Sequence, residues 1–108
     1  MEQLLEFEEG WDNLISDLKK HGVKVFKTIG GRKHFTIQYK NGRVEFKDPY
    51  MGCVISKSEM RKVYDRFIDV ESWKTYYYTD VTVHASYFLR LLKEYFVRNP
   101  YISEENVK

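Results

Sequence analysis

The strongest constraint on the fold comes from residues 34–47, which read HFTIQYKNGRVEFK. The Asn41-Gly42 dipeptide favours a type I′ turn, because both residues adopt positive φ at low cost. A two-residue turn then predicts the following cross-strand pairs, from the turn outward: Lys40 with Arg43, Tyr39 with Val44, Gln38 with Glu45, Ile37 with Phe46, and Thr36 with Lys47. In this register the apolar pairs share one face of the hairpin and the polar pairs share the other. The segment therefore predicts an antiparallel hairpin with one buried face.

A third strand is predicted immediately before this hairpin. Residues 23–29, VKVFKTI, alternate in polarity and are rich in β-branched side chains, and Gly30-Gly31 then signals a turn. We expect the exposed face of the hairpin to present His34, Thr36, Gln38, Glu45 and Lys47.

The first eighteen residues predict a helix. Its apolar stripe has spacings of 3 and 4 residues and consists of Leu4, Phe7, Trp11, Leu14 and Leu18. Gly22 is suited to the end of this helix. Gly10 is a poor helix former, by about 1 kcal/mol relative to Ala, so we expect it to interrupt the helix and leave the first turns separate or frayed.

A second helix is predicted to begin after Ser56. Ser56 can act as its N-cap with Glu59 completing a capping box, while Ile55 and Met60 form a hydrophobic staple. The buried stripe of this helix is predicted to contain Met60, Val63, Tyr64 and Phe67.

The C-terminal third is less clear before its last helix. Residues 75–83 have strand composition, but the segment can equally form an ordered loop. Residues 84–98 predict a helix that Asn99-Pro100 ends. Its apolar face contains Ala85, Phe88, Leu89, Leu92 and Phe96. The order α-β-β-β-α-(β or loop)-α predicts an α+β fold: a small antiparallel sheet of three or four strands with helices packed on one face.

Length and composition bound the remaining alternatives. A chain of 108 residues suggests one compact domain, which we place at residues 1–99, followed by a frayed tail at 100–108. Cys53 is the only cysteine, so no intramolecular disulfide can form, and no metal-binding spacing or cofactor motif is present. The acidic first residues and the lack of a long apolar run indicate a cytoplasmic protein with no membrane segment.

Charge is unevenly distributed along the chain. Residues 1–17 contain six acidic side chains and no Lys or Arg, whereas residues 18–47 contain nine Lys or Arg side chains and one Glu, a net charge of +8. Such a basic segment favours contact with phosphates, unless the acidic helix covers it. The candidate nucleic-acid-binding residues are Arg32, Lys33 and His34 at the hairpin tip, supported by Lys24, Lys27, Lys40, Arg43 and Lys47.

An excess of tyrosine supports a different interpretation. Tyr and Trp are common anchors of protein interfaces, because they bury much area at little entropic cost. The candidate interface residues are Trp73, Tyr76, Tyr77, Tyr78, Tyr87 and Tyr95. If residues 75–83 form a strand, Tyr76 and Tyr78 share one face and Tyr77 lies on the other. A protein-binding adaptor or inhibitor, which could also use the acidic first helix or form a homodimer, is therefore the main alternative.

A metal-dependent nuclease is a third hypothesis. Glu45-Phe46-Lys47 resembles the Glu-x-Lys pattern of such active sites, but residues 34–40 supply no second carboxylate for Mg²⁺. We therefore predict a non-enzymatic binding module that contacts nucleic-acid backbone through its basic hairpin.

Overall fold

The computed structural model describes residues 3–98 of the chain. Its elements, in chain order, are α1 (Phe7–His21), β1 (Val23–Lys27), β2 (His34–Lys40), β3 (Arg43–Asp48), α2 (Lys57–Val70), the 3₁₀ turn η1 (Thr75–Tyr78) and α3 (Ala85–Tyr95). The predicted α+β class is confirmed, with three antiparallel strands in the order β1-β2-β3. The predicted tail at 100–108 and the stop at Asn99-Pro100 lie outside the described residues.

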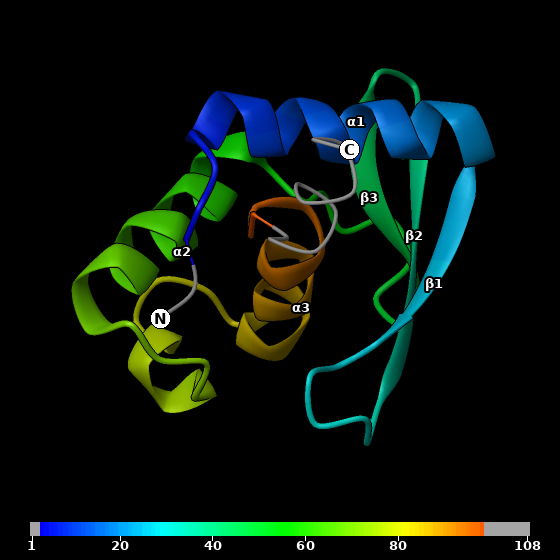
Figure 1. Cartoon of the computed structure of the whole chain (residues 1–108). Coiled ribbons are helices and arrows are strands. Elements are labelled where there is room, and N and C mark those ends of the chain that lie inside the picture. The colour runs from blue at the N-terminus through cyan, green and yellow to red at the C-terminus, as the bar shows by residue number, and fades with distance from the viewer. Residues whose placement is uncertain (1–2, 99–108) are drawn as a thin grey trace.

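All three helices lie on the same side of the sheet (Figure 1). The last helix, α3, occupies the middle of the molecule between α2 and the sheet, and α1 crosses over the ends of both layers (Figure 1). Aromatic rings join α3 to the strands: the centroids of Tyr87 and Phe35 are 4.8 Å apart, and those of Tyr95 and Phe26 are 6.0 Å apart. One continuous apolar core therefore connects the helices and the sheet.

The hairpin follows the predicted register near its turn. Asn41 and Gly42 have φ of 54° and 79°, as a type I′ turn requires, and the four pairs nearest the turn form as predicted. The fifth pair is wrong: Thr36 lies opposite Asp48 rather than Lys47, because the register shifts between Thr36 and Ile37. The bulge lies just beyond Phe46, where Lys47 and Asp48 are both polar, so the hydrophobic alternation could not reveal it.

The predicted exposure of Glu45 is also wrong, since its exposed fraction is 5%. Residues 53–55 return along the free side of β3 and cover this position. The Phe46 amide donates to the Cys53 carbonyl at 2.9 Å, and the Ile55 amide donates to the Val44 carbonyl at 2.8 Å. These backbone bonds occupy the edge of β3.

Helix α1 runs through Gly10 without a break, contrary to the sequence-based expectation. It begins at Phe7, and Leu4 lies outside the helix in an isolated bridge with Val97. The reason for a glycine here is tertiary: a Cβ built on Gly10 would lie 2.2 Å from Cδ2 of Phe96, whose side chain is fully buried.

Helix α2 begins as predicted. The Ser56 hydroxyl accepts from the Glu59 amide at 3.1 Å, and Ile55 and Met60 are both buried. The Glu59 carboxylate does not complete the capping box but accepts from the Thr82 hydroxyl at 2.5 Å, which joins α2 to the segment before α3.

No strand forms at residues 75–83, so the sheet has three strands in the described part of the chain. Residues 75–78 form η1, where three residues per turn direct successive side chains about 120° apart. Tyr78 is therefore fully buried, Tyr77 is half-buried, and Tyr76 is 62% exposed. The alternative in which Tyr76 and Tyr78 share a face is wrong. The Arg66 guanidinium fixes the segment by binding both oxygens of Asp80 at 2.7 Å.

Candidate nucleic-acid interface

The helices leave one face of the sheet open (Figure 1). Directly opposed residues of antiparallel strands share a face, so the pairs Lys27–His34 and Lys40–Arg43 lie opposite the buried side chain of Ile37. All four of these polar residues are exposed. The structure thus places cationic side chains from β1, β2 and β3 on the outer face of the sheet, Lys27 beside the β1–β2 loop and Lys40 with Arg43 at the opposite end, beside the hairpin turn.

The loop between β1 and β2 places further cations at one end of this face. Its base is closed by a hydrogen bond of 2.9 Å from the Thr28 amide to the Lys33 carbonyl, and the Gly31 amide donates to the Thr28 carbonyl at 2.8 Å. Arg32, Lys33 and His34 are all exposed. The loop is therefore an ordered turn that presents Arg32 and Lys33 to solvent.

Most of these cations have no acidic partner. Among residues 3–98, ion pairs involve none of Lys27, Arg32, Lys33, Lys40 and Lys47. We call these five residues the basic face. Arg43 differs because its Nε lies 3.1 Å from Glu45 Oε2. Unpaired cations on an open surface attract anions, and this arrangement suits phosphate groups.

Lys24, also predicted to belong to this set, lies on the other face of the sheet. It pairs with Ile37 across the strands, and its Nζ lies 2.8 Å from Asp17 Oδ2 on α1. The Tyr95 hydroxyl donates to the same oxygen at 2.5 Å. Burial raises the pKa of Asp17, but the hydrogen bonds from Lys24 and Tyr95 outweigh it and leave that pKa below its usual range. Lys24 therefore helps to join α1, β1 and α3.

The acidic first helix does not cover the basic face. Helix α1 packs against the side of the sheet that carries the core, where Asp17 reaches Lys24. Nearer its start, Glu8 forms an ion pair of 2.7 Å with Lys57 of α2. Asp17 and Glu8 of the acidic N-terminal segment therefore form their ion pairs away from the basic face.

Glu45, the carboxylate of the nuclease hypothesis, is occupied by neighbouring side chains. Its two oxygens accept from Gln38 Nε2 at 3.2 Å and from Arg43 Nε at 3.1 Å. Within residues 3–98, no group of three His, Cys, Asp or Glu side chains is placed to hold a metal ion. The contacts of Glu45 are those of a carboxylate that stabilises the hairpin.

The aromatic side chains of the protein-binding alternative are separated by the fold. Tyr78, Tyr87 and Tyr95 are buried in the core. Trp73 is half-buried and packs against Phe67, with the ring centroids 4.4 Å apart. Burial raises the pKa of Tyr78 to about 12. Three of the six predicted interface residues therefore serve the core.

Of these six residues, Tyr76 is the exposed one. Its ring stacks on that of Tyr77 with centroids 4.2 Å apart.

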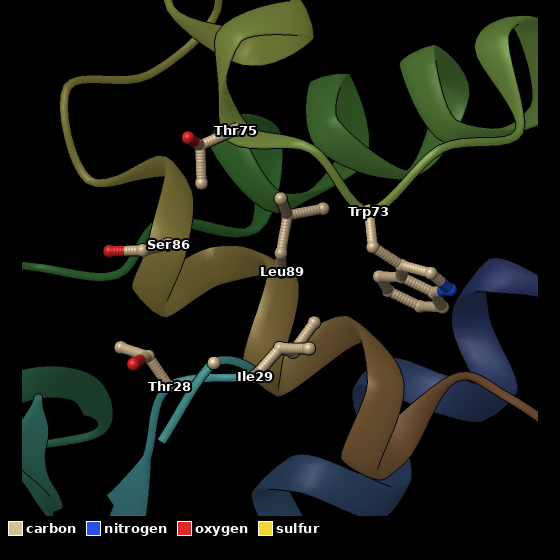
Figure 2. A pocket seen from close by; sticks show the side chains of 7 residues that line it. Thr28, Ile29, Trp73, Thr75, Ser86 and Leu89 are labelled. Atoms are coloured by element: carbon tan, nitrogen blue, oxygen red, sulfur yellow. The ribbon is translucent and has the colours of Figure 1, made fainter. Parts of the chain in front are cut away.

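Sequence reasoning missed a cavity beside the basic loop (Figure 2). It has a volume of about 150 Å³ and is lined by Thr28, Ile29, Gly30, Trp73, Thr75, Ser86 and Leu89. These residues come from the β1–β2 loop, the segment at η1 and the start of α3. No sequence motif joins segments so far apart, so only the folded arrangement reveals the cavity.

No protein-family model, curated protein or solved structure matches this chain, so its function is inferred from the arrangement of its residues. Among residues 3–98, no helix has both the length and the apolar character that crossing a membrane requires.

Proposed function

We propose that this protein is a non-enzymatic, cytoplasmic module that binds nucleic-acid backbone through its basic face. The observation that carries the proposal is a set of five exposed cations that have no acidic partner within residues 3–98: Lys27 and Lys40 on the open face of the sheet, Arg32 and Lys33 on the adjoining loop, and Lys47 near the end of β3. Binding would come from release of counterions when Lys and Arg approach phosphates, and it would carry little base specificity of its own.

The geometry gives a quantitative expectation. If all five cations of the basic face contact phosphates, log K should fall with log salt with a slope of about −4.5 for duplex DNA and about −3.5 for a single strand. Arg32 and Lys33 are adjacent on the ordered loop, so we expect both to contribute. Replacing both with Gln should reduce the magnitude of the slope by about 2.

The test is a fluorescence-anisotropy titration of labelled duplex and single-stranded DNA at several salt concentrations. Arg32→Gln with Lys33→Gln is compared with a control of equal charge change, Lys20→Gln with Lys62→Gln, which removes exposed cations from α1 and α2. The proposal requires the loop variant to lose affinity and salt dependence while the control retains both. Equal losses in the two variants, or no binding below about 10 μM at low salt, would refute it.

One specific observation favours a protein-binding role: the ring of the exposed Tyr76 stacks on that of Tyr77. A rigid exposed aromatic pair is a common anchor of interfaces. In its homodimer form this alternative predicts a dimer in sedimentation equilibrium that Tyr76→Ala dissociates. A monomer at all accessible concentrations rejects that form.

A further inference from the structure

The cavity beside the basic loop has two chemically different sides. Figure 2 shows the hydroxyl-bearing side chains of Thr28, Thr75 and Ser86 on one side, away from Trp73, with Leu89 and Ile29 nearer the indole ring. The residues that line the cavity are therefore apolar on the side of Trp73 and hydroxyl-bearing on the opposite side.

The hydroxyl groups can accept new partners. Those of Thr75 and Ser86 make no hydrogen bond with other residues of the described range 3–98. The Thr28 hydroxyl accepts a weak bond of 3.4 Å from the Lys33 amide, and its own proton remains available to a ligand. A hydroxyl can both donate and accept, so this side suits a ligand edge that carries carbonyl and N–H groups together.

The size of the cavity matches that of one ring. Its volume of about 150 Å³ equals that of an engineered cavity in another protein that holds a single benzene molecule. The apolar side is preformed, because Phe67 packs on Trp73 with centroids 4.4 Å apart and Lys93 Nζ lies 5.2 Å from the centroid of the Trp73 ring. A planar six-membered ring with polar groups along one edge matches both sides, whereas a fused two-ring system would extend out of the cavity.

The cavity adjoins the loop that carries two residues of the basic face, Arg32 and Lys33. Thr28, Ile29 and Gly30 line it, and the same short loop then continues to the exposed cations Arg32 and Lys33. A strand whose phosphates contact these two cations would pass the mouth of the cavity, where Ile29 is partly exposed. A base can turn into such a cavity only from a single strand, because in a duplex it is paired and stacked.

We propose that the cavity accepts one unstacked pyrimidine base of a single-stranded nucleic acid held by Arg32 and Lys33. The inference rests on the proposed function and deepens it, since it converts a general affinity for phosphate into a preference for pyrimidine-rich single strands. The hydroxyls would bind the polar edge of the base, and Leu89 and Trp73 would contact its ring.

The experiment compares three labelled twelve-nucleotide strands at low salt: oligo-dT, oligo-dA and a strand of abasic sites with the same phosphates. We expect oligo-dT to bind about tenfold more tightly than the abasic strand, with oligo-dA close to the abasic strand. The cavity-filling variant Ser86→Leu should reduce oligo-dT to the abasic level without changing abasic binding. Its control is Ser16→Leu, at an exposed position of α1.

A second variant guards against misfolding of the first. Thr75 is exposed, so Thr75→Val removes a cavity hydroxyl while keeping the shape of the side chain and the core. It should weaken oligo-dT binding severalfold, whereas Thr79→Val, an exposed hydroxyl of the neighbouring turn that does not line the cavity, should not.

The outcomes separate the two proposals. If the three strands bind equally and with strong salt dependence, the cavity inference is overturned while the proposed function stands. If no strand binds, the proposed function fails. Thymidine is then titrated into Trp11→Phe protein, in which Trp73 is the remaining tryptophan and is excited selectively over the tyrosines, and this titration decides about the cavity alone. Quenching that Ser86→Leu abolishes supports a pyrimidine pocket, and an unchanged Trp73 signal overturns it.

Discussion

Replacing Gly10 with Ala should destabilise the protein, although helix propensity predicts the opposite. Gly10 lies inside α1, where Ala is favoured over Gly by about 1 kcal/mol. A Cβ at this position would lie 2.2 Å from Cδ2, 2.6 Å from Cγ and 2.7 Å from Cε2 of Phe96. Carbon atoms prefer separations of about 3.5–4.0 Å, so the helix and the ring would have to move apart by more than about 1 Å.

The surroundings of Phe96 decide how large the penalty is. Its side chain is fully buried, and its ring centroid lies 5.4 Å from that of Phe7 and 5.9 Å from that of Tyr64. Inserting a methyl group into a packed core costs about 1–3 kcal/mol, and the rings around Phe96 leave little room for relaxation. With an overpacking penalty of about 3 kcal/mol and a propensity gain of about 1 kcal/mol, we expect a net loss of about 2 kcal/mol in the free energy of unfolding.

Urea unfolding measures this loss as a lower midpoint at unchanged m-value. A double-mutant cycle with Phe96→Ala isolates the clash, because Ala lacks all three of the ring atoms that the new Cβ would meet. In the Ala background Gly10→Ala should be neutral or stabilising by up to about 1 kcal/mol. Gly30→Ala is the matched control, since a Cβ added there would have no atom within 4 Å, and it should stabilise slightly through the unfolded chain. A Gly10→Ala protein more stable than the wild type would refute the packing explanation.

Three further predictions follow from contacts between elements. Folding lowers the pKa of Asp17, so the stabilisation by its carboxylate is present above the unfolded pKa of about 3.8 and is lost as pH falls through the folded pKa. The difference in free energy of unfolding between the wild type and Asp17→Asn should therefore shrink below about pH 4. A difference that stays constant with pH would contradict this. Arg66→Lys should increase local opening of residues 75–80, because Lys cannot bind both oxygens of Asp80. We expect faster amide hydrogen exchange in that segment, and an unchanged exchange rate would argue against this role of Arg66. The Tyr78 hydroxyl donates a hydrogen bond to the Ser72 carbonyl at 2.5 Å. Tyr78→Phe should therefore lower the free energy of unfolding, measured by urea titration, by about 1 kcal/mol. An unchanged free energy of unfolding would show that this hydrogen bond is not stabilising.

The candidate interface could be predicted only in part. The basic residues were evident from the sequence, and strand alternation correctly predicted that the four on the hairpin are exposed: His34, Lys40, Arg43 and Lys47. Alternation within one strand could not show that Lys24 faces Asp17, because that contact depends on where α1 packs. The burial of Glu45 likewise depends on residues 53–55, which the hairpin pattern does not involve.

By itself the sequence determined the local structure: the Asn41-Gly42 turn, the pairs nearest to it, the Ser56 cap and the α+β order of elements. These features depend on backbone preferences and on alternation between neighbouring residues, which can be read within a short window. The tertiary structure alone decided why Gly10 stands in a helix, why residues 75–78 form a 3₁₀ turn despite their strand composition, and where the cavity forms. Each of these depends on side chains distant in sequence that compete for the same space, and packing in the folded chain resolves that competition.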